Sequence, residues 1–173
     1  PSRRIRVRVA EDDAGLPAEA LPALEAQEPL KVAVLGGLNV PKGVRVLRAV
    51  AERAAARRAP ARFTLIGHSP EAAELRRAKV TVTGAYRAED LDGLIRQYAP
   101  HVIFLPAVWP ETWSFVLTSA LRQSLPVVAF DIGAPAERLR RLGRGTLLPL
   151  DLAERPHDVL AVLLQMRHAW GGR

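Results

Sequence analysis

One acidic side chain, Glu111, stands between a proline and an apolar helical stretch in the run WPETWSFVLTSAL. Pro110 fixes the chain just before it, and Thr112 and Ser114 are candidate caps of the helix that follows. A carboxylate at a helix start stabilises the helix dipole by about 0.3–1 kcal/mol. The same carboxylate can accept paired hydrogen bonds from sugar hydroxyls, while the free amides of 112–115 hold the rest of a ligand. The residues by themselves leave both interpretations open.

The loop GGLNVPKG at 36–43 joins an apolar run to a helical one. Gly36 and Gly37 allow a ligand to approach the backbone, Lys42 supplies a cation, and the next helix offers free amides. These features favour an anion such as a diphosphate. The spacing is neither that of the GxGxxG fingerprint nor that of the Lys-Ser/Thr phosphate loop. The alternative is a tight turn with a solvated lysine.

Other residue types that could do chemistry are sparse. His68, in the loop GHSP, follows an apolar run, whereas the other three histidines lie elsewhere with no metal-ligand spacing (His101, His157 and His168). A metal site is therefore not expected. The serines near Glu111 lack a general base, so acyl transfer is not expected either. Trp113 is either a core residue, which we favour, or a lid over a ligand. In the loop DIGAPAER, Gly133 allows close approach of a ligand, and Arg138 is expected to form a surface pair with Glu137.

Six short apolar runs alternate with helical stretches from residue 30 onward. The runs occupy 30–37, 61–67, 79–84, 101–107, 126–131 and 145–150. Alternation of this kind predicts a doubly wound, parallel, Rossmann-like α/β sheet of about six strands with helices on both faces. Ligands of such sheets bind beyond the carboxyl ends of the strands. We therefore expect the loops GGLNVPKG, GHSP, GAYRAED, PAVWPETW and DIGAPAER to share one rim.

We expect two parts along the chain, a lead-in or interdomain segment at 1–29 and one domain at 30–173. The lead-in contains a short alternating run at 5–9, which predicts a strand. The prolines at 17 and 22 prevent one continuous helix after it. Because the chain starts at Pro1 and not at Met, we interpret it as a processed or excised piece of a longer protein.

Composition narrows the classes of function. The 173 residues suffice for one folded domain, and the absence of cysteine excludes disulfides and thiolate metal sites. No apolar run approaches the roughly 20 residues that span a bilayer, and there is no signal-peptide core. The net charge of +7 comes from arginines dispersed over several helices without interleaved aromatics, which disfavours nucleic acid. An anionic small ligand or an acidic membrane surface fits the same charge.

Several of these segments, in this order, resemble the C-terminal donor-binding domain of GT-B glycosyltransferases. They are VLGGLNVPKGVRVLRAVAE, TLIGHS, VTVTGAYRAEDLDGLI and VIFLPAVWPETWSFVLTSALRQSLPVVAFDIGAPAER. The similarity is greatest to the group-one, family-four type of retaining enzymes, in particular bacterial members of polysaccharide biosynthesis. It covers about 30–170, and its most specific segment is 106–138.

The resemblance implies roles for individual residues. Lys42 matches the lysine that holds the donor diphosphate, while the family's arginine falls on Gly37, so that contact is absent or comes from another side chain such as Asn39. Glu111 matches a glutamate that binds hydroxyls of the transferred sugar. A second glutamate, which grips the ribose, falls on Ser119, and Tyr86 is a candidate contact of the base. The implied donor-binding set is Gly36, Gly37, Asn39, Lys42, His68, Tyr86, Glu111, Thr112, Trp113, Ser114, Phe115 and Ser119, with Glu111 and Lys42 also assigned to catalysis.

The resemblance also implies a reaction and its partners. The reaction is retaining transfer from a nucleoside-diphosphate sugar to a glycan or lipid-linked acceptor, with no cofactor and no metal. The acceptor belongs to an N-terminal domain that this chain lacks, so the isolated fragment should be inactive. We expect a cytoplasmic protein, with peripheral association at the inner face of the membrane as an option. The alternatives are a non-catalytic nucleotide- or sugar-binding module of the same fold and an unrelated Rossmann-like regulatory domain.

Overall fold

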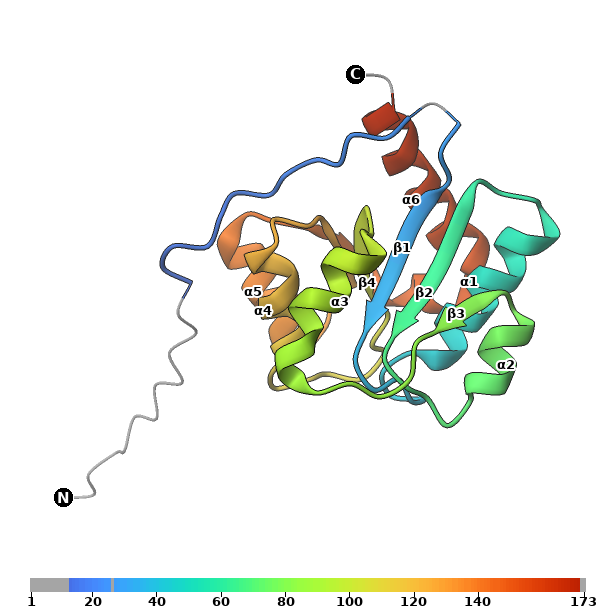
Figure 1. Cartoon of the computed structure of the whole chain (residues 1–173), viewed down its shortest axis with the longest axis horizontal. Coiled ribbons are helices and arrows are strands. Elements are labelled where there is room, and N and C mark those ends of the chain that lie inside the picture. Colours follow the sequence, from blue (N-terminus) through green and yellow to red (C-terminus); the bar gives the residue numbers. More distant parts are fainter. Residues whose placement is uncertain (1–12, 26, 172–173) are drawn as a thin grey trace.

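The computed structural model describes residues 13–25 and 27–171, and its centre is a parallel sheet (Figure 1). Within these residues six strands pair in the order β3-β2-β1-β4-β5-β6, and every pairing is parallel. The order reverses between β1 and β4, which are therefore the strands beside the topological switch point. The strands are β1 (Leu30–Leu35), β2 (Ala61–Ile66), β3 (Val80–Val82), β4 (Val102–Leu105), β5 (Val127–Phe130) and β6 (Thr146–Leu148).

Helices cover both faces of the sheet. Figure 1 shows α3, α4 and α5 on one side and α1, α2 and α6 on the other. None of the helices in the described ranges is long and apolar enough to cross a membrane. Their bounds are α1 (Val44–Ala56), α2 (Ala72–Arg77), α3 (Leu91–Tyr98), α4 (Phe115–Arg122), α5 (Gly133–Leu142) and α6 (Pro156–Gly171), with 3-10 turns at Ala88–Asp90 and Leu150–Glu154.

Two apolar cores, one on each face, explain why the central strands β4 and β5 are apolar along their whole length. On one face α1 buries Leu47 and Val50 against the sheet, together with residues of α2 and α6. On the other face Ile95 of α3, Leu117 of α4 and Leu139 of α5 form the second core. Every residue of β4 and β5 is buried. The predicted doubly wound α/β fold with about six strands is confirmed.

The segment before β1 follows the outside of the domain without helix or strand over 13–25, as the prolines predict. Leu24 is buried in the core on the α1 side, and the Ala20 N–H donates to the Ser124 carbonyl at 2.8 Å. Asp13 binds both Arg138 and Arg141. Burial raises the pKa of Asp13, but hydrogen bonds from the two arginines outweigh it and leave this pKa below its usual value. The predicted strand at 5–9 lies outside the described residues.

Candidate functional site

A pocket of about 160 Å³ lies at the switch point, between the loops that follow β1 and β4. The β1 side contributes Gly36, Gly37 and Lys42, and the β4 side contributes Glu111 and the residues that lead into α4. This is the position where open α/β sheets bind ligands, because the connections from the two strands diverge there. The two loops in which we predicted chemistry therefore form one site.

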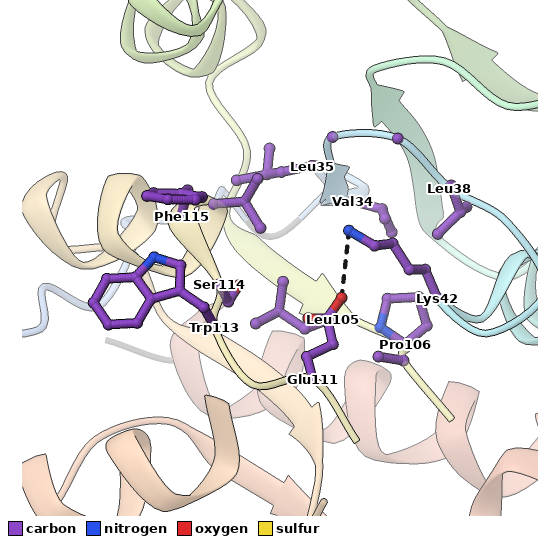
Figure 2. Close-up of a pocket in the computed structure, with 14 residues that line it drawn as sticks. Val34, Leu35, Leu38, Lys42, Leu105, Pro106, Glu111, Trp113, Ser114 and Phe115 are labelled. Carbon is purple, nitrogen blue, oxygen red and sulfur yellow. Dashed lines mark ion pairs between the residues drawn. The ribbon is translucent and has the colours of Figure 1, made fainter. Parts of the chain in front are cut away.

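Lys42 and Glu111 point at each other across this pocket (Figure 2). The Lys42 Nζ lies 3.4 Å from the Glu111 Oε1, and the side chains are 51% and 22% exposed. The backbone N–H of Lys42 donates to the Asn39 Oδ1 at 3.1 Å, so this side-chain oxygen shapes the turn that carries the lysine. A cation and a carboxylate, each accessible from the pocket, thus come from loops that are distant in sequence.

A glycine that the sequence did not single out fixes the lysine loop to the β4 loop. Gly43 has φ +87°, and a Cβ on it would lie 1.9 Å from the Pro106 carbonyl oxygen. The Val108 N–H donates to the Pro41 carbonyl at 3.0 Å in the same contact. No larger residue fits there, because the obstacle is backbone and the conformation is left-handed. The helix α1 starts at this point with Gly43 as its N-cap and no side-chain cap.

Glu111 is held through its own backbone by the start of α5. The Ala134 N–H donates to the Glu111 carbonyl at 2.9 Å. A Cβ on Gly133, which has φ +69°, would lie 2.8 Å from the Glu111 nitrogen. We expected Gly133 to make room for a ligand, but the room is taken by the backbone of Glu111. The start of α5 is therefore a support that sets where this carboxylate lies.

The position of Glu111 relative to α4 bears on the helix-dipole interpretation. The N-cap is Ser114, which is buried and whose Oγ accepts from the Leu117 N–H at 3.4 Å. The first turn of α4 contains no acidic residue, so Glu111 lies ahead of it. Because the dipole effect falls off within the first turn, that effect explains little of this carboxylate's placement. In the described part of the chain, no partner is found for the N–H groups of Phe115 and Val116, which remain available beside the pocket.

The other predicted residues flank the pocket in different ways. The His68 ring lies over Gly37, and the hydroxyl of the half-buried Tyr86 is 3.8 Å from where a Cβ of Gly36 would be. Burial raises the pKa of the Tyr86 phenol, which stays protonated and able to donate. Thr112 is exposed. The structure thus brings His68 and Tyr86 to the glycine loop.

Trp113 belongs to neither apolar core. It is half-buried and forms an edge-to-face pair with Phe115, with ring centroids 5.7 Å apart, on one wall of the pocket (Figure 2). Within the described residues the buried Trp113 Nε1 has no hydrogen-bond partner. Phe115 is 78% exposed. Our expectation of a core tryptophan is therefore wrong, because the loop before α4 keeps this side chain at the rim.

Ser119 lies in a second, adjacent groove. It shares that groove with Tyr86 and Arg122, while Trp113 and Phe115 border both hollows. The two hollows together could receive an elongated ligand, with an anionic part at the glycine loop and another part along α4.

Arg138 corrects a prediction. Rather than pairing with Glu137 on the surface, it is 3% exposed, donates to the Asp13 Oδ1 at 2.7 and 3.0 Å, and donates to the Thr118 Oγ1 at 2.8 Å. The buried side chain is satisfied because the segment before β1 supplies a carboxylate. No group of His, Cys, Asp and Glu that could hold a metal occurs among the described residues.

Comparisons with known proteins give a family and a shared fold. A family model described as glycosyl transferases group 1 matches residues 29–165. None of the curated proteins matches the sequence.

Solved structures share the fold. The apo form of the lipopolysaccharide outer core galactosyltransferase WaaB superposes with a TM-score of 0.67 at 16% identity, over 88% of this chain and 44% of that one. The C-terminal domain of the group 1 glycosyl transferase LpcC from Francisella tularensis gives 0.62 at 15% identity, over 91% of each chain. Anabaena HepE in complex with UDP gives 0.58 at 19% identity, over 80% of this chain and 45% of that one. At these identities the likeness shows a common fold, and this chain spans less than half of WaaB and HepE.

Proposed function

Because the chain belongs to the group 1 glycosyltransferases, we propose that residues 30–173 form the domain of such an enzyme that binds a nucleoside-diphosphate sugar. The observation that carries the proposal is the meeting of Lys42 and Glu111 at 3.4 Å in the switch-point pocket. A donor of this class presents a diphosphate, which needs a cation and N–H groups, next to a sugar, which needs a hydrogen-bond acceptor. The pocket offers both within one ligand length.

Each group then has a defined part in the transfer. Lys42 and the free amides at the start of α4 stabilise the charge that develops on the diphosphate when its bond to the anomeric carbon breaks. Glu111 accepts hydrogen bonds from sugar hydroxyls and orients the ring. The acceptor hydroxyl attacks the anomeric carbon and its proton passes to the departing diphosphate, and in the proposed retaining reaction the product keeps the anomeric configuration of the donor. No residue of this chain has to act as the general base.

The rest of the reaction belongs to parts of the protein beyond this domain. The chain spans 44% of WaaB and 45% of HepE, and HepE was solved in complex with UDP. We propose that an N-terminal domain supplies the acceptor site, that the product is a polysaccharide or lipid-linked glycan, and that the basic charge favours an anionic membrane surface nearby. The isolated domain should then bind donor weakly and transfer nothing.

A second candidate is a non-catalytic nucleotide- or sugar-binding module of the same fold. Two positions favour it. Gly37 carries no side chain towards a phosphate, and Ser119 offers the second groove a hydroxyl where a carboxylate would grip a ribose at two points. The two candidates agree on binding and differ on transfer.

Calorimetric titration of the full gene product with UDP, GDP and their sugars, followed by an assay of sugar transfer, tests both candidates. We expect binding of at least one nucleotide, loss of most of it in Lys42→Ala, and transfer reduced by about a hundredfold or more in Glu111→Ala. Matched controls are Lys79→Ala and Glu52→Ala, an exposed lysine and an exposed glutamate outside the pocket. Binding without transfer would favour the non-catalytic module, and the absence of any binding would refute both.

A further inference from the structure

Gly37 differs from Gly43 and Gly67 in what a Cβ at its position would contact. At Gly43 and Gly67 a Cβ would lie 1.9 Å from a backbone oxygen, and both have positive φ. Gly37 has no positive φ, and a Cβ there would meet only the His68 ring, at 3.2 Å from Cε1 and 3.3 Å from Nε2. Neither the backbone conformation nor a neighbouring main chain demands a glycine at 37. The constraint at this position comes from the His68 ring, which a Cβ at 37 would crowd and displace by a few tenths of an ångström.

The loop that carries His68 is fixed, while its ring is not engaged. The His68 carbonyl accepts from the Leu38 N–H at 2.9 Å, and the Gly67 N–H donates to the Thr83 Oγ1 at 2.9 Å. The side chain is exposed, and among residues 13–25 and 27–171 no partner is found for its two ring nitrogens. The ring thus lies over the glycine loop on a fixed backbone, with its hydrogen-bonding capacity unused.

The adjacent backbone has one unused donor as well. The Gly36 N–H donates to the Ile66 carbonyl and the Leu38 N–H to the His68 carbonyl, each at 2.9 Å. Between them, the Gly37 N–H has no partner in the described part of the chain. Gly37 lines the same pocket as Lys42. An anion bound at the glycine loop would therefore lie near the Gly37 N–H and Lys42, which line the pocket, and near the His68 ring, which packs on Gly37 just outside the pocket lining.

We propose that His68 is a ligand of the donor diphosphate and that Gly37 is a glycine in order to seat its ring. This inference rests on the proposed function, since it assigns a contact within the same site. An imidazole N–H donates to a phosphate oxygen, while the Lys42 ammonium binds the diphosphate across the glycines. His68 thus provides a side-chain contact that position 37 cannot provide.

Calorimetry of the full gene product with UDP, GDP and inorganic pyrophosphate tests the assignment. Loss of one hydrogen bond to a charged oxygen should weaken binding of all three by about tenfold in His68→Ala, with an unchanged thermal midpoint because the side chain is exposed. Pyrophosphate contains no base or sugar. If His68 contacts the nucleoside instead, the affinity of His68→Ala for pyrophosphate will equal that of the wild type, and this result would overturn the proposal.

A double-mutant cycle measures whether the effects of Gly37→Ala and His68→Ala on binding depend on each other. In the presence of His68, Gly37→Ala should displace the ring and weaken binding by several-fold, whereas in the His68→Ala background the same change should cost little. Additive losses would show that the ring is not seated on Gly37. If the wild-type protein binds nucleotide and His68→Ala binds it equally well, this inference fails while the proposed function stands. If the wild type binds none of the three ligands, the proposed function itself fails.

Discussion

A lysine, a glutamate and a histidine meet at the amino ends of β1 and β4, and the same residue types lie in the loops at the carboxyl ends, where the histidine follows β2. The two clusters are built in opposite ways. At the amino ends, the Lys31 Nζ lies 2.7 Å from the Glu28 Oε1, and the buried His101 accepts the Lys31 N–H on its Nδ1 at 3.1 Å. The His101 Nε2 lies 3.5 Å from the same glutamate. Each ring nitrogen of His101 thus faces a partner, and the cluster ties β1 to β4.

At the carboxyl ends the same residue types remain open to a ligand. The pair of Lys42 and Glu111 is longer, at 3.4 Å, and it joins two loops rather than neighbouring positions on one segment. The His68 ring has no partner within the described residues. Residue type alone therefore does not distinguish a structural cluster from a candidate binding site. Unused hydrogen-bonding capacity on a supported loop does.

The largest expected effect comes from a substitution at Gly133, whose backbone packs against that of Glu111. Gly133→Ala places a Cβ 2.8 Å from the Glu111 nitrogen and 2.9 Å from its oxygen, at φ +69°. The left-handed conformation costs about 1–2 kcal/mol of unfolding free energy, and the collision adds about 1–3 kcal/mol. Because the collision moves Glu111, transfer should fall by at least about tenfold. Denaturant unfolding and a transfer assay, both on the full gene product, measure the two losses.

Gly143→Ala is the matched control for that change. Gly143 has φ +62° at the end of α5, and nothing lies within 4 Å of its added Cβ. The control should therefore show only the conformational cost and full transfer. Equal losses of stability and activity in the two variants would contradict the view that α5 positions Glu111 through its backbone.

The sequence was sufficient to predict the strands, the helices and the rim on which the site lies. Apolar runs such as 101–107 report burial on both faces, and the loops after such strands must share an edge. The sequence was not sufficient to predict the backbone contacts that hold the site residues in place. The approach of Gly133 to Glu111 is a contact between two backbones, and no side-chain pattern encodes it. Arg138 was misplaced for a related reason, since its carboxylate partner lies 125 positions earlier in the chain.

The contribution of the amino-end cluster to stability should depend on pH, because His101 titrates within it. Burial lowers the pKa of His101, and the nearby Lys31 lowers it further, against the opposing effect of Glu28. A folded-state pKa below the ordinary 6.5 means that the unfolded chain takes up a proton first as the pH falls. The contribution to stability is then complete above about pH 6.5 and is lost as the pH falls through the folded-state pKa. The slope from one proton is at most about 1.4 kcal/mol per pH unit.

His101→Gln isolates this contribution, because the glutamine oxygen can accept the Lys31 N–H but does not titrate. The free energy of unfolding of the variant should depend less on pH just below 6.5 than that of the wild type. The carboxylates with lowered pKa, Asp13 and Glu28, lose their contributions only at more acidic pH, below their ordinary values of 3.8 and 4.5. Parallel profiles for the two proteins between pH 6.5 and 5 would show that His101 is not the titrating group.

The smallest expected effect concerns the ion pair of Lys42 and Glu111, which a bound diphosphate would have to break. Without ligand, Lys42 is held by Glu111, so a diphosphate has to draw the lysine away from the carboxylate. Glu111→Gln removes that competition and should tighten the binding of UDP or GDP by about one-and-a-half- to fivefold, the range expected for an exposed pair worth about 0.2–1 kcal/mol. The gain should shrink as salt is raised. Transfer should fall in the same variant, because the sugar loses its carboxylate.

Glu28→Gln, which breaks the shorter pair at the other end of β1, should leave nucleotide affinity unchanged. If calorimetry instead shows weaker binding of UDP and GDP to Glu111→Gln, Glu111 contacts the nucleoside diphosphate itself, and the division of labour between Lys42 and Glu111 has to be redrawn.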